Sequence, residues 1–238
     1  MPISILRTAL TSLREMVSPS HCELCGGYMG GKAERMKYVC NTCLDSLDTP
    51  PIPKELYNRV SRNFAKDEMS ITSIFSLVSI DHESPIMELL HSMKYRGMSK
   101  IGYEFGMEIG ETLRHVGLTD FDLIVSVPIH STLLRDRGYN QSDYISGGIS
   151  QVLDIPVVFD VVVRSRYTES QTTLSYEQRK VNLIGAFSGG RNASVAHGKK
   201  LLLVDDVFTT GTTLNSCATA LLETGALRVD VATLAAAA

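Results

Sequence analysis

The sequence lacks three features that would each indicate a common class of protein. No stretch approaches about 18 consecutive apolar residues, the length that a membrane-spanning helix needs. No Gly-x-x-x-x-Gly-Lys-[Ser/Thr] motif is present, which excludes a P-loop nucleotide site. Neither sign of charge dominates, since the formal net charge is −3. Composition therefore excludes helical membrane proteins and P-loop enzymes, and any contact with nucleic acid or a membrane surface must come from a local patch.

The first residues form a short amphipathic pattern instead of a long apolar run. The apolar positions that share one helical face are Ile3, Leu6, Leu10, Leu13 and Val17. Such a pattern is unlike the uniform apolar core of a signal peptide and is too short to span a bilayer. We therefore expect an amphipathic helix over residues 1–18, no membrane span and a cytoplasmic location.

Cysteine is scarce, and four of the five cysteines lie close together in the sequence. They form two Cys-x-x-Cys pairs, Cys22 with Cys25 and Cys40 with Cys43, separated by fourteen residues. Two thiolate pairs at this spacing suit tetrahedral Zn²⁺ better than disulfides in a reducing cytosol or a redox pair. A closed four-thiolate site leaves no position for a substrate, so we predict a structural zinc module over residues 19–48.

Three basic residues lie between the two cysteine pairs and face a single acidic residue. Lys32, Arg35 and Lys37 accompany Glu34, and the rings of two tyrosines lie nearby in the sequence. One interpretation is a basic hairpin that binds single-stranded nucleic acid, with the tyrosines stacking on bases. The other is a solvated hairpin without a partner.

A proline-rich stretch, Thr49-Pro50-Pro51-Ile52-Pro53, separates this module from the rest of the chain. It can neither continue a helix nor pair in a central strand, so we place a domain boundary there and a second domain at 54–238. Hydrophobic periodicity predicts strands at 71–80, 121–127, 156–163, 183–187, 201–204 and 228–234, and helices at 85–95, 101–116, 144–153 and 214–222. Their alternation indicates an α/β fold, a mostly parallel sheet with helices on both faces.

The most informative stretch runs from Leu201 to Thr213. Its four leading apolar residues predict a strand buried on both faces, and Asp205 and Asp206 follow directly. A threonine-rich loop comes next, made of Thr209, Thr210, Gly211, Thr212 and Thr213, before the predicted helix. Unpaired backbone N–H groups and the positive end of the helix dipole converge on such a loop. We therefore predict a phosphate site.

The chemistry at the edges of this loop narrows the choice of ligand. Two carboxylates precede it, and it contains no lysine. Carboxylates repel a phosphate unless another partner holds them, and both sugar hydroxyls and Mg²⁺ can do so. The ligand implied is a ribose 5-phosphate. This stretch has three alternative interpretations. A Walker B strand would need the missing P-loop, and a receiver domain would need more residues than follow Asp206. The third alternative is an ordinary buried strand with an acidic edge.

Cationic residues follow two other predicted elements. Lys94 and Arg96 lie near the end of the helix at 85–95, where they could contact a diphosphate or simply complement the helix dipole. Arg135 and Arg137 lie in a predicted loop at 131–141, close to the phosphate site if the strands are parallel. Two guanidiniums there could bind a diphosphate bidentately, or one could pair with a neighbouring aspartate.

A long polar stretch at 164–181 carries a net positive charge. Polar segments of this length inside a compact domain are usually lids or disordered, and the charge favours a lid over an anionic ligand. Cys217 lies among apolar residues of the last predicted helix and is expected in the core, not as a nucleophile.

Several motifs occur in an order that resembles the ComF/GntX family, whose members combine a zinc finger with a phosphoribosyltransferase-like domain. They are Cys22-x-x-Cys25 with Cys40-x-x-Cys43, Lys94-Tyr95-Arg96-Gly97, Val127-Pro128-Ile129-His130 with Arg135-Asp136-Arg137-Gly138-Tyr139-Asn140-Gln141, Arg166-x-Thr168-x-x-Gln171-x-x-Leu174 with Arg179, Asn182 and Gly185-Ala186-Phe187, and Val204 to Thr213. The last motif resembles the site for 5-phosphoribosyl 1-diphosphate (PRPP) in the type I phosphoribosyltransferase fold. One departure is that Thr132 and Leu133 stand where the family often has basic residues.

The resemblance implies roles for individual residues. Asp205 and Asp206 would hold the ribose hydroxyls, residues 209–213 would hold the 5-phosphate, and Mg²⁺ would bind with PRPP. The residues implied for the diphosphate are Arg135, Arg137, Lys94 and Arg96. Those implied for catalysis are Asp205, Asp206, Arg166 and Arg179.

Two functions are compatible with these roles. The resemblance implies a link to natural transformation, in which the protein handles incoming single-stranded DNA with competence proteins that include a helicase-like ATPase. Alternatively, the chain is an active Mg²⁺-dependent phosphoribosyltransferase acting on an unidentified base or amine. Such an enzyme needs cations on the leaving diphosphate and a lid against hydrolysis, and the cationic residues and the segment at 164–181 are candidates for both.

Overall fold

The structure is a computed structural model that describes residues 21–30, 33–65, 68–81, 84–95, 97–166 and 185–237. The amphipathic helix expected at 1–18 and most of the segment expected to form a lid lie outside these residues. So do three of the cationic residues discussed above, Lys32, Arg96 and Arg179.

A four-stranded sheet lies at the centre of the fold, with all neighbouring strands parallel and the order β1-β6-β5-β2. Its strands are β1 (Ile74–Ile80), β2 (Leu123–Ser126), β5 (Lys200–Phe208) and β6 (Arg228–Ala237). β6 continues three residues beyond its predicted end, because Ala235 to Ala237 pair with β1. The predicted parallel α/β architecture is confirmed.

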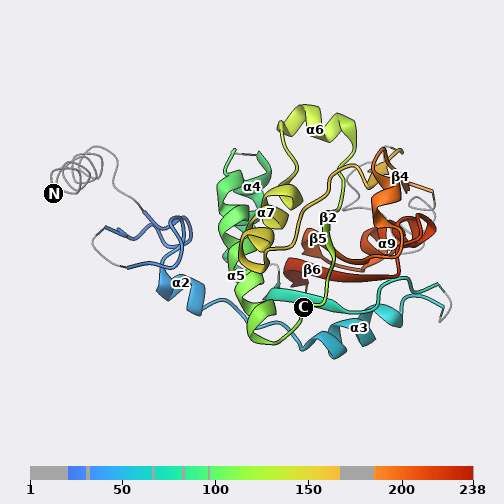
Figure 1. The fold of residues 1–238 in the computed structure, drawn as a ribbon. Coiled ribbons are helices and arrows are strands. Elements are labelled where there is room, and N and C mark those ends of the chain that lie inside the picture. Colours follow the sequence, from blue (N-terminus) through green and yellow to red (C-terminus); the bar gives the residue numbers. More distant parts are fainter. Residues whose placement is uncertain are drawn as a thin grey trace, which may run out of the picture.

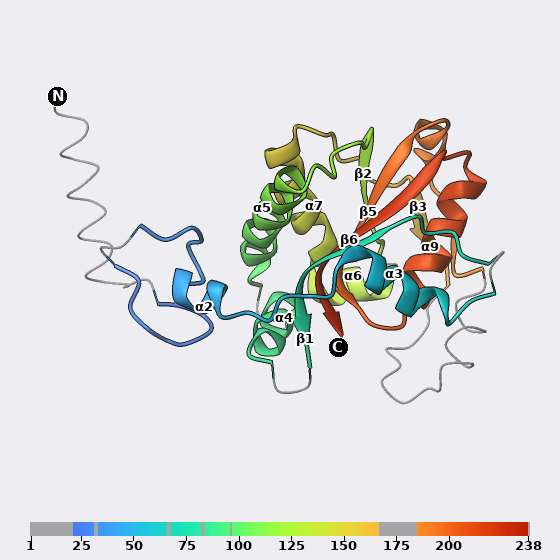
Figure 2. The same ribbon diagram turned by 90° about the horizontal axis from the view of Figure 1, so that it is seen from below.

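Helices cover both faces of the sheet, as Figures 1 and 2 show. On one face lie α4 (Ile86–Tyr95), α5 (Ser99–His115) and α7 (Gln141–Leu153), and on the other α3 (Pro53–Ser61) and α9 (Thr212–Glu223). Strand β5 explains this layering. Leu201 and Leu203 belong to the core under α3 and α9, whereas Leu202 and Val204 belong to the core under α4, α5 and α7. The apolar run of β5 therefore supplies both cores.

Helices α5 and α7 approach each other closely at two glycines. A Cβ atom on Gly106 would lie 2.1 Å from the carbonyl oxygen of Ile145, and one on Gly148 would lie 2.0 Å from that of Tyr103. Only glycine allows backbones this near, so these two positions set how tightly α7 packs beside α5. The start of α7 reaches the candidate site, so the packing also positions that site.

Three predicted elements differ in the structure. The loop expected at 131–141 contains a helix, α6 (Ser131–Arg137), because the side chain of His130 accepts the N–H of Thr132 and Gly138 ends the helix in a left-handed conformation. The strand expected at 156–163 is interrupted at Asp160, which has φ 58°. Before the interruption Val157 forms a parallel bridge with Ile124 of β2, and after it β3 (Val162–Arg164) forms. β3 pairs antiparallel with β4 (Phe187–Gly189), which begins where the strand expected at 183–187 was to end.

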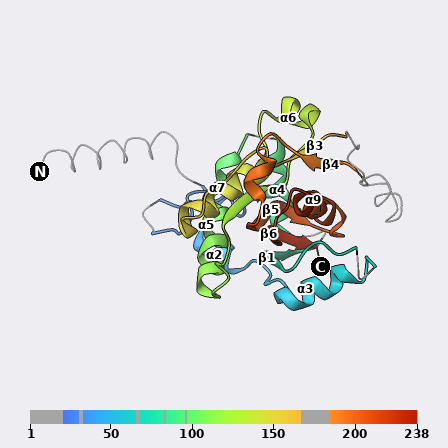
Figure 3. The ribbon, with the colours of Figure 1, turned by 45° about the vertical axis from the view of Figure 1, so that its right-hand side comes forward.

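The small pair β3-β4 and helix α6 lie on the same side of the central sheet in Figures 1 and 3. A short 3₁₀ helix, η1 (Ala193–Ala196), connects β4 to β5. Cys217 on α9 is fully buried among the apolar residues of one core, which confirms its predicted place.

The cysteine-rich segment lies beside α5 and contains one short helix, α2 (Asn41–Asp45). Its buried side chains Met29, Met36 and Val39 belong to the same core as α4 and α5. The segment therefore packs on the α/β fold through apolar contacts. Within the described ranges, no helix is long and apolar enough to cross a membrane.

Candidate functional site

The loop between β5 and α9 requires a glycine at its centre. Gly211 has φ 79°, and a Cβ atom there would lie 2.7 Å from Cγ1 of Val60 and 3.1 Å from the ring of Phe208. Both the left-handed conformation and this contact exclude other residues. Gly211 is also the N-cap of α9, and no side chain caps the helix. The N–H groups of the first turn can therefore donate to a ligand, and the helix dipole favours an anion at this end of α9.

Threonine hydroxyls line the same loop. Oγ1 of Thr210 and Oγ1 of Thr212 lie 2.9 Å apart, and Thr212 is buried whereas Thr209 is exposed. Thr213 is half-buried in the first turn of α9. The structure therefore brings together the five residues predicted to bind the 5-phosphate, as a loop of hydroxyl and N–H donors at a helix N-terminus.

The acidic pair lies within β5 and not beyond its end, since the strand continues to Phe208. Asp205 Oδ1 accepts a hydrogen bond from the hydroxyl of Ser142 (2.9 Å) and another from the N–H of Asp206 (2.9 Å). Burial, with the charge of Asp206 as the second cause, raises the pKa of Asp205 to about 7. Asp205 therefore binds a proton much more readily than an exposed carboxyl does.

Lys94, at the end of α4, pairs directly with the second carboxylate. Its Nζ lies 2.8 Å from Oδ2 of Asp206, with both side chains largely buried. Burial lowers the pKa of Lys94, but the charge and hydrogen bond of Asp206 outweigh burial, and the pKa is raised overall. Lys94 is therefore a cation that already has a partner in the site.

A hydrogen-bond network at the start of α7 supports the acidic pair, and it was not anticipated from the sequence. Asn140 caps the helix by accepting the N–H of Ser142, and its amide donates to Val127 O (3.0 Å) and to Asp143 (2.9 Å). Asp143 also accepts the hydroxyl of Ser126. Burial raises the pKa of Asp143, although the hydrogen bonds from Ser126 and Asn140 oppose the shift. The spacing of Asn140 and Asp143 resembles a capping box and could have revealed this helix start.

Arg137 connects three helices around the same site. Its guanidinium lies 5.2 Å from the ring centroid of Tyr95, and its terminal nitrogens donate to Tyr95 Oη and to Gln141 Oε1, each at 3.4 Å. Its Nε is buried without a hydrogen-bond partner in the described part of the chain. A buried donor of this kind costs free energy unless a ligand accepts from it. Because Tyr95 follows Lys94 directly in the chain, these contacts place Arg137 near the end of α4 that carries Lys94.

The other four predicted cations have no described contact with the acidic pair. Arg135 lies exposed on α6, and Arg166 lies exposed just after β3, at the edge of a range that is not described. Arg96 and Arg179 fall outside the described residues. The structure thus brings Lys94 and Arg137 to the acidic pair, and leaves the roles of the other four as predictions.

The four cysteines predicted to bind zinc are close together. All four Sγ atoms lie within 4.8 Å of one another, and those of Cys25 and Cys40 are 4.0 Å apart. A tetrahedral site with Zn–S bonds of about 2.3 Å needs sulfur atoms about 3.8 Å apart, so the cluster fits Zn²⁺. Burial opposes ionisation of Cys22, but backbone N–H groups, first that of Cys40, outweigh it and lower its pKa to about 7. The pKa of Cys43 is raised instead, by burial first and then by hydrogen bonds with the neighbouring thiols, so the fit to Zn²⁺ rests on the sulfur distances.

The basic hairpin between the cysteine pairs is largely engaged with acidic residues. Arg35 forms an ion pair with Asp45 and lies 3.8 Å from Glu108 of α5. The backbone N–H groups of Lys37 and Tyr38 both donate to Glu104 Oε2, at 2.8 and 3.3 Å. These contacts attach the hairpin to α5. The ion pair of Arg35 with Asp45 is exposed and therefore weak, so both interpretations of the hairpin, with and without a nucleic-acid partner, stay predictions.

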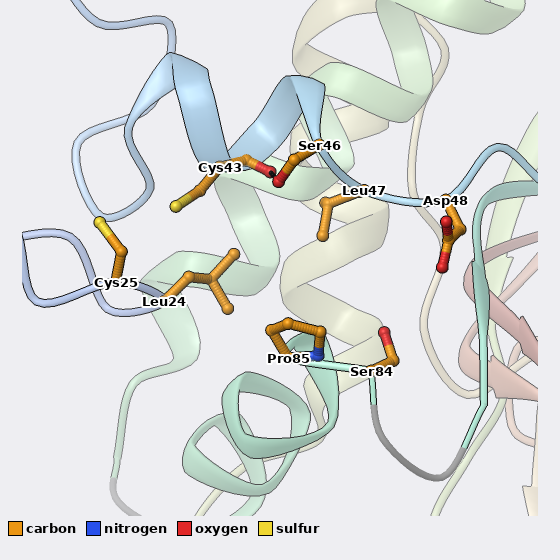
Figure 4. Close-up of a pocket in the computed structure, with 8 residues that line it drawn as sticks. All are labelled: Leu24, Cys25, Cys43, Ser46, Leu47, Asp48, Ser84 and Pro85. Carbon is orange, nitrogen blue, oxygen red and sulfur yellow. Dashed lines mark hydrogen bonds between the residues drawn. The ribbon is translucent and has the colours of Figure 1, made fainter.

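A small cavity lies between the zinc module and the start of α4, and neither member of the acidic pair lines it (Figure 4). Its volume is about 180 Å³. The residues that line it are Leu24, Cys25, Cys43, Ser46, Leu47, Asp48, Ser84 and Pro85. Two of these are predicted metal ligands, so the cavity is the gap left where the module meets α4.

Known proteins share sequence with most of the α/β fold. The family model described as phosphoribosyl transferase domain matches residues 142–238. DNA utilization protein YhgH of Escherichia coli (strain K12) is 36% identical over 155 residues, 63% of this chain and 67% of that protein. Competence protein F of Haemophilus influenzae is 38% identical over 116 residues, 49% of this chain and 51% of that protein.

Among solved structures, glutamine phosphoribosylpyrophosphate amidotransferase of B. subtilis, complexed with ADP and GMP, is similar with a TM-score of 0.38. The match covers 55% of this chain and 26% of that one, at 23% sequence identity.

Proposed function

The chain belongs to the ComF/GntX family, and from this premise we propose that it binds PRPP, or a closely related phosphoribosyl diphosphate, at the loop between β5 and α9. The fold is that of type I phosphoribosyltransferases, joined to a four-cysteine module. The observation that carries the proposal is the combination at one place of an uncapped helix N-terminus behind Gly211 and the acidic pair Asp205 and Asp206. The helix N-terminus suits an anion, and the two carboxylates suit hydroxyl groups a few bonds away from it. A ribose 5-phosphate carries both the anion and the hydroxyls.

Each part of the ligand has a partner in this arrangement. The 5-phosphate accepts hydrogen bonds from residues 209–213, and the ribose hydroxyls donate to Asp205 and Asp206. The diphosphate meets Lys94 and Arg137, whose buried Nε has no other acceptor among the described residues. The carboxylate oxygens also suit Mg²⁺, which would neutralise diphosphate charge when it is bound with the ligand. Ser142 keeps Asp205 oriented toward the sugar.

The biological setting that we propose is natural transformation, in which the protein handles incoming single-stranded DNA. The support comes from the names of relatives, which mention DNA utilization and competence. In this setting the phosphoribosyl site either binds its ligand without turnover or is an evolutionary remnant that no longer has a role. Competence proteins such as a helicase-like ATPase are the proposed partners.

A second candidate function is phosphoribosyl transfer to an unidentified base or amine, and the pair of cations near the acidic residues favours it. In that reaction the bond from C1 of the ribose to the diphosphate breaks, the diphosphate leaves with the electron pair, and a nitrogen of the acceptor bonds to C1 and loses a proton. Lys94 and Arg137 would stabilise the charge of the leaving group. Arg166 and Arg179 keep their proposed catalytic roles in the closing segment.

Calorimetric titration of the intact, zinc-loaded protein with PRPP and Mg²⁺ tests the site. We expect saturable binding that is lost, by at least about 100-fold in affinity, when Asp205 and Asp206 are both changed to Asn, because the amide donates where the hydroxyl needs an acceptor. Asp154→Asn, at the end of α7, is the control with an unchanged affinity. Equal affinity in the double variant and the wild type would refute the assignment of the site. Release of diphosphate is then measured in the presence of candidate acceptors. Release would indicate the enzyme, and binding without release would indicate the binding protein.

A further inference from the structure

The second carboxylate of the candidate site is already occupied by a side chain from another part of the fold. Lys94 comes from the last turn of α4, and its Nζ lies 2.8 Å from Asp206 Oδ2. The exposed fractions of the two side chains are 27% for Lys94 and 14% for Asp206. A ribose hydroxyl that donates to Oδ2 of Asp206 therefore has to compete with an ammonium ion that is already there.

The cost of breaking this pair depends on what the ligand offers to Lys94. Separating a largely buried ion pair without a new partner leaves an uncompensated charge, which costs far more than an exposed pair would. A ribose 5-phosphate provides hydroxyls for Asp206 but leaves the ammonium unpaired. A ribose phosphate with a diphosphate on C1 provides hydroxyls and, in addition, anionic oxygens for the displaced ammonium.

We propose that Lys94 determines the specificity of this site, because it makes Asp206 available only to sugars that carry a diphosphate to which Lys94 can move. The inference rests on the proposed phosphoribosyl site and adds a selection step to it. Lys94 thus exchanges one anionic partner for another as the ligand binds.

The contrast with the neighbouring cation explains why Lys94 is the one that moves. Arg137 is held by Tyr95 and Gln141 and by the ring of Tyr95, so it stays in place in both states. Lys94 has a flexible four-carbon stem, and the chain turns at Gly97 (φ 71°) shortly after it. The positive charge of Arg137 beside it also marks the region to which a diphosphate is attracted.

The experiment compares two probes on the intact protein. PRPP and ribose 5-phosphate are titrated calorimetrically in the presence of Mg²⁺, and the ratio of their affinities is the readout. In the wild type we expect PRPP to bind at least about 100-fold more tightly. In Lys94→Gln we expect ribose 5-phosphate to bind more tightly than in the wild type and PRPP more weakly, so that the ratio falls at least about 10-fold. A purely structural role for Lys94 would weaken both ligands together.

Three further variants keep the test decisive. Lys94→Arg retains the charge and should retain the ratio. Lys100→Gln removes an exposed lysine at the start of α5 and should change neither affinity. If Lys94→Gln does not fold, the double variant Lys94→Gln/Asp206→Asn removes both charges and leaves no buried ion unpaired. Because Asp206→Asn by itself weakens both ligands, the ratio of the double variant is compared with that of Asp206→Asn and should be the lower of the two.

The outcomes separate this inference from the proposed function. A wild type that binds PRPP, with an affinity ratio that stays the same in Lys94→Gln or in the double variant, overturns the inference and leaves the site in place. A wild type that does not bind PRPP overturns the proposed function, and the selection step with it.

Discussion

The two candidate ligand sites of this molecule are built in opposite ways. The four-cysteine cluster takes all of its ligands from residues 22–43, a single short stretch. The phosphoribosyl site takes its groups from β5, α9, α4, α6 and the start of α7, which lie far apart in the sequence. The first site ties together a segment whose buried side chains, among them Met29, Met36 and Val39, belong to the core shared with α4 and α5, whereas the second is held in place by both cores of the sheet. The comparison teaches that loss of a ligand should damage the first site and spare the second.

The largest expected effect is the removal of zinc. Zinc contributes about 10 kcal/mol or more to the folding of small metal-dependent modules, so Cys43→Ser or chelation should unfold the segment at 21–48. The α/β fold should remain, since most of the core that the segment shares with α4 and α5 comes from the sheet and its helices. Hydrogen exchange of the zinc-loaded and chelated proteins measures this. Loss of protection in β5 and β6 as well would show that the two regions form one cooperative unit, against the comparison drawn above.

Next in size is the effect of filling the space at Gly211. Gly211→Val should abolish PRPP binding, by at least about 100-fold, because the side chain collides with Val60 and Phe208 and distorts the N-terminus of α9. Gly198→Ala is the matched control, since Gly198 has φ 69° but open space around it. Calorimetry should show normal binding by the control. Comparable losses in both variants would mean that general strain, and not the loop, is responsible.

A smaller effect is expected at the contact between the two regions. Glu104→Ala leaves the N–H groups of Lys37 and Tyr38 without their acceptor and should destabilise the attachment of the zinc module by about 1–3 kcal/mol. Glu111→Ala, which removes an exposed carboxylate on the same helix, should cost less than about 0.5 kcal/mol. Denaturant unfolding monitored in the module measures both. Equal costs would show that Glu104 is not a specific attachment point.

The smallest expected effect concerns pH and Asp205. Because the pKa of this carboxyl in the folded protein is about 7, above its value in the unfolded chain, the folded state binds the extra proton between these values. Stability from this group therefore rises as pH falls from 8 to 6, by about 1 kcal/mol, and Asp205→Asn should remove that rise. Unfolding without added Mg²⁺ at both pH values gives the difference between variant and wild type. An identical pH dependence of the two proteins would contradict the raised pKa.

The comparison also explains what could be predicted from the sequence. The clustering of the four cysteines and the loop between β5 and α9 were predictable, because each belongs to a contiguous motif. Zinc and a phosphate as their ligands stay predictions. The partner of Asp205, Ser142, was not, because it depends on how α7 packs beside α5 through Gly106 and Gly148. The pairing of Lys94 with Asp206 likewise joins residues from separate elements. Periodicity missed α6, a short helix whose ends depend on His130 and Gly138.

The order of strands in the sheet has a consequence for synthesis of the protein on the ribosome. β1 has a single neighbour, β6, and β6 is made after every other described element. Throughout translation β1 therefore waits with its backbone groups unpaired, an edge open to association with other chains. The zinc module can fold early by contrast, since all four of its cysteines emerge together. Newly made chains should thus depend on chaperones until β6 arrives and joins the first strand to the rest of the sheet.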